Sequence, residues 1–317
     1  MTTATGPSLR HSPPLPPPQA AARFTQTNIA DTDNDGIAEL IAVDHTSHTL
    51  YQWAGQPDIN TTSSGASRGD GTFAARTKIT GGWTYTQTLA GDLDGDGITD
   101  LVATDTDHTL CWWPGAVHGG YGAKQQITAN WNFTQTLVTD LDGDHIPDLV
   151  AVDTDHVLWW WPGTGTLHTR NHQHHRKAVL FTSAFAPKQR ITGGWAFTQT
   201  SASDLNGDHI TDLVAVDGQQ TLWWWPGTGT GLPHTPTASF RSAFGIKQQL
   251  ATTWHYTQTV PGLLRDPDPR GERLIARDSD GSLYQWTPTT TRPTTTTQTT
   301  DPTQTTPGPR RRTTTGW

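Results

Sequence analysis

Four stretches of the sequence place oxygen-bearing side chains, carboxylates in all but one case, at positions 1, 3, 5 and 9 of a nine-residue segment, and Asp92 to Asp100 shows the full pattern. Side-chain oxygens at these positions, together with the backbone carbonyl of position 7, form the all-oxygen cage that Ca²⁺ prefers. The predicted ligands are Asp31, Asp33, Asp35, Ile37 and Glu39 in loop one; Asp92, Asp94, Asp96, Ile98 and Asp100 in loop two; Asp140, Asp142, Asp144, Ile146 and Asp148 in loop three; and Asp204, Asn206, Asp208, Ile210 and Asp212 in loop four. The sequence therefore predicts about four calcium ions.

The charge balance of the chain favours the same interpretation. Of the 29 acidic residues, 15 lie in these four loops, where crowded carboxylates repel one another unless a cation is present. Four Ca²⁺ ions would carry eight positive charges against the formal net charge of −8. Asp and Gly also form ordinary turns, which would explain one such loop but not four with the same spacing.

The loops differ in ways that predict different affinities. Position 6, where the chain must wrap around the ion, is Gly36 or Gly97 in loops one and two but His145 or His209 in loops three and four. Loop four also has the neutral Asn206, so we expect the affinity order two ≈ one > three > four. Protonation of the imidazoles near their reference pKa of about 6.5 is expected to weaken sites three and four first.

The loops belong to a longer repeat of the chain. The tripeptide Thr-Gln-Thr precedes each Asp-rich loop, and an apolar run and a Trp-containing run follow it. A fourth element, such as 124–128, precedes repeats two to five, so the repeats start near 24, 76, 124, 188 and 247. The fifth repeat has Arg270 where a ligand should stand and is predicted to hold no metal.

Four short β-runs in each repeat are typical of a propeller blade. We predict an all-β fold, a β-propeller of about five four-stranded blades over 23–286. Residues 1–22, which are Pro-rich, and 287–317, which are rich in Thr and Pro, are expected to be disordered. The first repeat has no preceding fourth element, so the ring either closes imperfectly or belongs to a truncated relative of a longer array.

The nine-residue loop, the Asp-Leu-Val-Ala run and the ending Trp-Trp-Pro-Gly-Thr-Gly resemble the FG-GAP (VCBS-type) repeat of bacterial extracellular proteins, over about residues 24–286. The integrin α-subunit N-terminal propeller belongs to the same superfamily. The resemblance implies a calcium-binding propeller that is secreted or displayed on the cell surface. It also implies a role in adhesion or ligand binding, or as an accessory to hydrolases.

We therefore expect a non-catalytic extracellular module that binds a glycan or a surface protein. The alternative is an accessory or substrate-targeting domain of a secreted hydrolase. The acidic balance disfavours nucleic acid, and no apolar run is long enough to insert into a membrane. The candidate ligand-binding residues are Trp112, Trp160, Trp224, Tyr85, His108, His156 and Tyr256. Core packing between blades and ordinary hairpin turns are the alternative roles for these residues.

Overall fold

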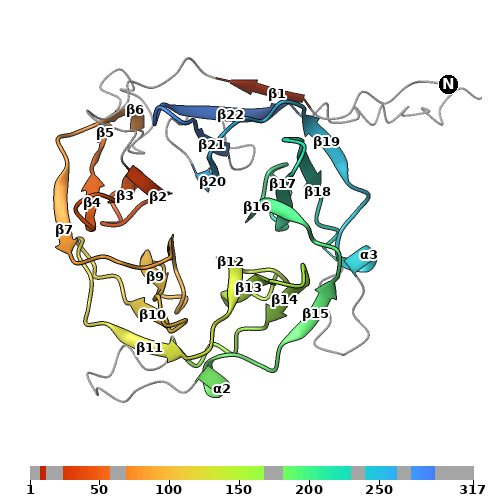
Figure 1. Ribbon diagram of the computed structural model, residues 1–317, viewed down its shortest axis with the longest axis horizontal. Coiled ribbons are helices and arrows are strands. Elements are labelled where there is room, and N and C mark those ends of the chain that lie inside the picture. The colour runs from red at the N-terminus through yellow and green to blue at the C-terminus, as the bar shows by residue number, and fades with distance from the viewer. Residues whose placement is uncertain are drawn as a thin grey trace, which may run out of the picture.

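The computed structural model describes residues 8–11, 24–57, 69–167, 181–229, 240–262 and 273–289. These residues form an all-β ring of five four-stranded antiparallel sheets, which confirms the predicted propeller (Figure 1).

The strands of each blade follow in order from the centre of the ring outward. Blade one contains β2 (Phe24–Ala30), β3 (Glu39–Asp44), β4 (Thr49–Trp53) and β7 (Thr77–Gly81). Blade two contains β8 (Gln87–Gly91), β9 (Asp100–Thr104), β10 (Leu110–Trp113) and β11 (Gln125–Thr128). Blade three contains β12 (Phe133–Thr139), β13 (Asp148–Asp153), β14 (Leu158–Trp161) and β15 (Gln189–Thr192). Blade four contains β16 (Phe197–Ser203), β17 (Asp212–Asp217), β18 (Leu222–Trp225) and β19 (Gln248–Ala251). Blade five contains β20 (Gln258–Gly262), β21 (Arg273–Arg277), β22 (Leu283–Thr289) and β1 (Ser8–His11).

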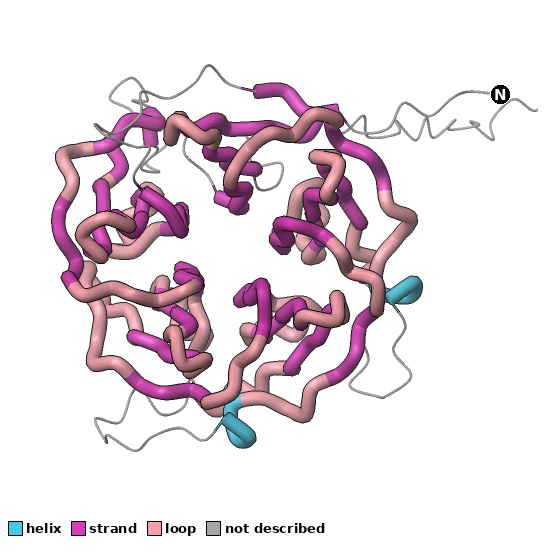
Figure 2. The backbone as a smooth tube through the Cα atoms, viewed as in Figure 1, coloured by secondary structure: helices cyan, strands magenta, loops and turns pink. Residues whose placement is uncertain are grey.

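The first strand of each blade lines the centre of the ring, and the fourth strand forms its outer rim (Figure 2). The second strand is almost entirely buried, since every residue of β3 and β9 is buried. Neighbouring blades cover both of its faces, which explains its continuous apolar run. Among the described residues, no helix is long and apolar enough to cross a membrane.

The fourth element of the repeat lies in a different blade from the one that the repeat pattern suggested. Strand β7 precedes the second Thr-Gln-Thr motif in the chain but pairs with β4 of blade one. The same arrangement holds for β11, β15 and β19, which each form the rim of the blade before. The starts near 76, 124, 188 and 247 therefore mark outer strands of the preceding blades.

Blade five takes its outer strand from the beginning of the chain. Strand β1 pairs antiparallel with β22, from Ser8 opposite Thr289 to His11 opposite Trp286. Leu9 packs against the buried cluster that includes Trp254. The expectation of disorder for 1–22 was therefore wrong for residues 8–11, which supply the fourth strand that the repeat pattern lacked. Strand β22 also continues to Thr289, beyond the predicted limit at residue 286.

The two threonines of the Thr-Gln-Thr motif each have a fixed partner within the blade. In blade three, Thr134 Oγ1 donates to the carbonyl oxygen of Val152 on the second strand, at 3.0 Å. Thr136 Oγ1 accepts a hydrogen bond from Trp131 Nε1 at 2.9 Å, which satisfies a buried indole. The same two contacts recur in blades two, four and five.

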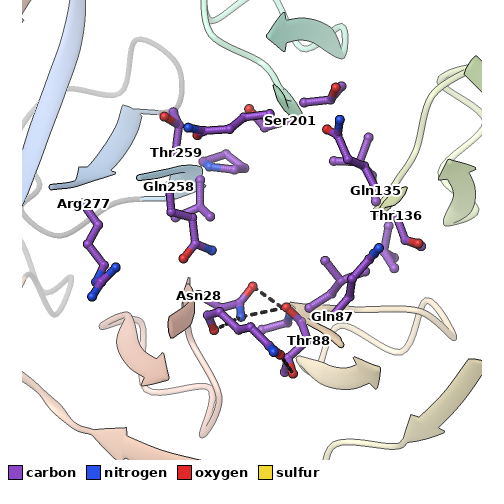
Figure 3. Close-up of a pocket in the computed structure, with 18 of the residues that line it drawn as sticks. Asn28, Gln87, Thr88, Gln135, Thr136, Ser201, Gln258, Thr259 and Arg277 are labelled. Atoms are coloured by element: carbon purple, nitrogen blue, oxygen red, sulfur yellow. Dashed lines mark hydrogen bonds between the residues drawn. The ribbon is translucent and has the colours of Figure 1, made fainter. Parts of the chain in front are cut away.

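The central glutamine of the motif joins each blade to the next. Gln135 Nε2 donates to the carbonyl oxygen of Phe197 in the following blade, at 2.7 Å. Gln26, Gln87 and Gln199 make equivalent bonds of 2.8, 3.1 and 2.8 Å. These glutamines line a central cavity of about 420 Å³, whose walls Figure 3 shows. The motif therefore serves the assembly of the ring.

Candidate metal centres

Each Asp-rich loop connects the first strand of a blade to its buried second strand. In loop two, Asp92 Oδ1 accepts from the backbone N–H of Gly95 at 2.7 Å, and Oδ2 accepts from that of Gly97 at 2.8 Å. Asp96 Oδ1 accepts from the N–H of Ile98 at 2.9 Å. These bonds wrap the backbone around the carboxylates and gather the acidic side chains on the inside of the loop.

Position 6 of each loop adopts the left-handed conformation that the sequence suggested. The φ angle is 87° at Gly36 and 84° at Gly97, and it is 66° at His145 and 65° at His209. This region is costly for a residue with a Cβ atom, so the histidines add strain to loops three and four. Their imidazoles are 96% and 95% exposed, with Nδ1 3.7 and 3.9 Å from the position 1 carboxylates.

The carboxylate at position 9 is buried and is held by backbone groups. Asp148 is 1% exposed, and its two oxygens accept from the N–H groups of Leu141 at 2.9 Å and Gly163 at 2.7 Å. Burial raises the pKa of Asp148 to about 7 and that of Asp100 and Asp212 to about 6. Position 9 therefore ties its loop to the turn that follows the third strand.

Trp112, Trp160 and Trp224 do not form an exposed stacking surface. Their side chains are 2%, 0% and 6% exposed, so the prediction that they bind a ligand at the surface is wrong. Each indole lowers the pKa of the position 9 carboxylate of its own blade, which opposes the effect of burial.

Blade one has Gln52 in the place of these tryptophans. Gln52 Nε2 donates to Thr32 Oγ1 at 2.9 Å, and Thr32 Oγ1 donates to Glu39 Oε2 at 2.9 Å. Gln52 is therefore linked to the position 9 carboxylate of blade one through Thr32.

Position 3 provides the clearest test of whether a cation fits. Asp94 is 2% exposed, and its Oδ2 has no hydrogen-bond partner among the described residues. Burial, followed by the charges of Asp100, Asp96 and Asp92, raises the pKa of Asp94 to about 8. Asp33 Oδ1 in loop one is a second buried oxygen without such a partner. A buried carboxylate oxygen that no donor satisfies is costly, and a bound cation removes that cost.

Three of the four loops bring their acidic side chains close enough to share an ion. One ligand oxygen from each of three residues lies within 4.8 Å of the other two. The three groups are Asp31, Asp33 and Glu39; Asp92, Asp94 and Asp96; and Asp140, Asp142 and Asp148. The donor set and the buried oxygens fit Ca²⁺.

In loop four, a side-chain amide takes part in the pairing of the acidic groups. Asn206 Nδ2 donates to Asp208 Oδ2 at 3.0 Å, so the side-chain amide supplies a donor to the position 5 carboxylate. In the fifth repeat, residues 263–272, including Arg270, lie outside the described residues. Arg273, which is 3% exposed, begins β21 at the place that Asp100 holds in β9.

The other candidate ligand residues lie in turns and connections between strands, on the face opposite the Asp loops. His108 and His156 are exposed turn residues with φ of 63° and 57°. Their carbonyl oxygens accept from the backbone N–H groups of Trp131 and Trp195, both at 2.7 Å. These histidines therefore have a turn role.

The two tyrosines pack against tryptophans of the blade junctions. Tyr85 lies 4.6 Å from Trp83 between ring centroids, and its hydroxyl accepts from Lys124 Nζ at 2.8 Å. Tyr256 lies 4.7 Å from Trp254, and burial raises its pKa. Both side chains are partly buried, so each presents only part of its surface to a ligand.

The sequence model of the FG-GAP-like repeat family matches residues 31–103 and 92–151. Residues 31–151 carry FG-GAP-like repeats. The matched FG-GAP-like segments contain loops one, two and three, and the propeller fold agrees with the family. No protein of curated function is similar to the chain in sequence.

Several solved structures are similar to the chain at low sequence identity. A lectin from Agrocybe aegerita that recognises non-reducing terminal N-acetylglucosamine is 13% identical, with a TM-score of 0.43 over 80% of this chain and 61% of the lectin. The Tc holotoxin pore of Photorhabdus luminescens is 12% identical, with a TM-score of 0.42 over 89% of this chain and 14% of that chain. RS223 β-xylosidase is 10% identical, with a TM-score of 0.45 over 89% of this chain and 96% of the enzyme. The chain thus spans less than two thirds of the first two, and likeness at this level assigns it neither a ligand nor a chemistry.

Proposed function

We propose that this chain is a calcium-stabilised β-propeller that acts as a non-catalytic ligand-binding module outside the cell or on its surface. The observation that carries the metal part is Asp94, a buried carboxylate whose Oδ2 has no hydrogen-bond partner among the described residues. Its neighbours Asp92 and Asp96 place oxygens within 4.8 Å of it and of each other. A divalent cation would neutralise this group.

The residues that would hold each ion are the side chains at positions 1, 3, 5 and 9 and the carbonyl oxygen of position 7. In loop two the carbonyl belongs to Ile98, whose N–H already donates to Asp96. Position 9 begins the buried second strand, so calcium would fasten the loop to the centre of the blade. The calcium ion would supply positive charge to the carboxylates and link the loop to the second strand.

The proposed location follows from the affinity expected of such loops. Calcium-binding modules of extracellular proteins have dissociation constants of about 10⁻⁴–10⁻³ M. Sites of this strength are filled where Ca²⁺ is millimolar, outside the cell. A protein that depended on them for stability would work in that compartment.

The binding part of the proposal rests on a group of aromatic and charged side chains that blades three and four both carry. In blade three, Lys188 Nζ lies 4.3 Å from the ring centroid of Trp159, and Trp159 Nε1 donates to Asp153 Oδ2 at 2.6 Å. Blade four repeats this group with Lys247 4.1 Å from Trp223, which donates to Asp217 at 2.7 Å. Aromatic and charged groups that recur in neighbouring blades suit a glycan or surface protein that offers several weak contacts at once.

Thermal unfolding tests the metal part directly. The purified chain, freed of metal with a chelator, should gain unfolding temperature as Ca²⁺ rises to millimolar concentration, because ligands that bind the folded state stabilise it. Each site should contribute about 2.7 kcal/mol at a hundredfold excess over its dissociation constant. Titration calorimetry would count the ions, and an unchanged unfolding temperature would remove calcium from the proposal.

The binding role needs a separate measurement. Arrays of glycans and of surface proteins would be probed with the labelled chain in Ca²⁺ and again in chelator. Retention that requires Ca²⁺ is expected if the ions hold the ring in its binding shape. Failure to retain any arrayed ligand, with the calcium response intact, would leave a calcium-stabilised propeller without this role.

A further inference from the structure

The connection between the third and fourth strands of blade three inserts a phenylalanine at a blade junction. Helix α2 (Phe181–Ala184) lies on the outer rim between β11 and β15 (Figure 1). The ring of Phe181 meets Trp131 at 6.0 Å and 68° and Trp161 at 6.4 Å and 70°. These are edge-to-face contacts, which aromatic rings favour. Phe181 therefore covers a pair of tryptophans where two blades meet.

Blade four repeats this arrangement with helix α3 (Phe240–Ala243). The ring of Phe240 meets Trp195 at 5.7 Å and 63° and Trp225 at 6.3 Å and 77°. The second tryptophan of each covered pair is buried, with Trp161 5% and Trp225 6% exposed. Two junctions of the ring thus carry the same phenylalanine plug.

The matching connection of blade two has no plug. Tyr121 bridges to Gly115 as Phe185 does to Gly163 in blade three, which aligns the two connections. The chain forms a tight turn between Gly115 and Tyr121, in which the N–H of Ala116 donates to the carbonyl oxygen of Gly120 at 3.1 Å. The turn is too short for a helical turn, and Val117, four residues before Tyr121 as Phe181 is before Phe185, is 58% exposed.

The missing plug leaves a pocket of about 440 Å³ between blades one and two. Trp83, Trp113 and Tyr121 line one side, and Gln52 with residues 77–80 line the other. Trp113 is partly exposed, unlike its equivalents Trp161 and Trp225. The amide of Gln52 is turned away toward Thr32.

The tryptophan pair of this pocket already has the geometry of the two plugged pairs. Trp83 and Trp113 lie 4.8 Å apart at 42°. The corresponding values are 4.7 Å and 43° for Trp131 with Trp161, and 4.8 Å and 40° for Trp195 with Trp225. A receiving site that needs no rearrangement loses little affinity to ordering on binding.

We propose that this pocket receives an aromatic side chain, such as phenylalanine, from a partner polypeptide. The ring would lie edge-on to Trp83 and Trp113, as Phe181 and Phe240 lie on their own pairs. The inference rests on the proposed binding role and names the ligand chemistry of one site. The occupant is inferred from what the chain itself places at the two equivalent junctions.

The probe for this site is a peptide of residues 178–184, Ala-Val-Leu-Phe-Thr-Ser-Ala, capped at both ends, with a matched peptide carrying Phe181→Ala. Titration calorimetry with the full chain in Ca²⁺ should show the phenylalanine peptide binding at least about tenfold more tightly, because burying such a ring is worth more than 1.4 kcal/mol. Equal affinities for the two peptides, or no binding of either, would overturn the proposal. A preference for N-acetylglucosamine or galactose over the peptide at this pocket would overturn it as well.

A grafted connection in blade two tests whether the peptide binds in this pocket, and it also fills the pocket with a side chain of the chain itself. Residues 116–123 are replaced by the blade four connection 228–246, which brings its own Phe240 to the pocket. The grafted chain should unfold at a higher temperature and lose peptide binding by at least about tenfold. Val117→Ala, outside the pocket, is the control and should bind as the parent does. A grafted chain that folds and binds the peptide unchanged would place the site elsewhere. Failure of the peptide to bind leaves the calcium response untouched, so the two proposals fail separately.

Discussion

The side chain of Gln258 makes two hydrogen bonds with the backbone of Thr27, 231 residues away in sequence. Gln258 Nε2 donates to the carbonyl oxygen of Thr27 at 2.6 Å, and the N–H of Thr27 donates to Gln258 Oε1 at 2.8 Å. At the junction of blades three and four, Gln135 makes one such bond, from Nε2 to Phe197. The junction between the last blade and the first therefore has the more complete amide contact at its inner edge.

This difference predicts unequal costs for removing the glutamines. Gln258→Leu should lower the free energy of unfolding by about 2 kcal/mol, because it leaves both a donor and an acceptor of Thr27 without a partner. Gln135→Leu, the matched control, should cost about 1 kcal/mol. Urea unfolding at saturating Ca²⁺ measures both, and a larger loss for the control would contradict the closing role of Gln258.

Loop four offers a substitution whose sign should depend on calcium. Asn206→Asp removes the amide bond to Asp208 and adds a fourth acidic side chain to the loop. In chelator the variant should unfold at a lower temperature than the parent, because carboxylates repel. In millimolar Ca²⁺ it should bind the fourth ion more tightly, because calcium affinity follows ligand charge. Asp94→Asn in loop two is the reverse control, because it removes a carboxylate at position 3, where Asn206→Asp adds one. If Asn206→Asp changes the unfolding temperature in the same direction in chelator and in Ca²⁺, loop four holds no metal.

The buried carboxyls predict an inverted dependence of stability on pH in the absence of metal. The pKa values are about 8 for Asp94, about 7 for Asp148 and about 6 for Asp100. The folded chain therefore holds protons that the unfolded chain, with Asp near 3.9, has released. Stability should then fall as pH rises from about 5 to about 8.

Thermal unfolding in chelator across this range measures that fall, and Ca²⁺ should flatten the trend because the ion replaces the protons. Asp94→Asn should flatten it in chelator, since an amide does not titrate. A stability that instead rises with pH in chelator would show that burial does not raise the pKa of these carboxyls.

The glycine that follows Trp-Pro in blade three predicts a cost for added volume. A Cβ atom at Gly163 would lie 2.3 Å from the carbonyl oxygen of Pro147 and 2.6 Å from Ile146 Cγ2, so loop three would have to shift. Gly163→Ala should cost about 1–3 kcal/mol and weaken calcium binding in that loop. Gly218→Ala meets nothing within 4 Å and is the control. Equal unfolding temperatures and calcium isotherms for the two variants would show that the contact is unimportant.

The blades and the acidic loops could be predicted from the sequence because they depend on local pattern. Thr-Gln-Thr marks the inner strands, and alternate acids with a residue that tolerates positive φ mark the loops. The partner of Gln135 could not be predicted, because this contact depends on register. Trp160 seemed a surface residue since Gln52 stands in its place, yet its side chain is fully buried.

The strand at Ser8–His11 escaped prediction for a related reason. A four-residue edge strand carries little pattern of its own, and Pro-rich sequence surrounds it. Only the unfilled edge of β22, at the other end of the chain, gives the segment a role.

The pairing of β1 with β22 also bears on how the chain is made. Strand β1 is translated before every blade, but its partner Leu283–Thr289 leaves the ribosome after all five inner strands. Four blades can form during synthesis from neighbouring strands, whereas the fifth must wait for the pairing of β1 with β22, which are far apart in sequence. Until then the nascent ring exposes an unpaired edge, which is a hazard for association with other chains. The last event in the biogenesis of this propeller is therefore the return of its earliest strand.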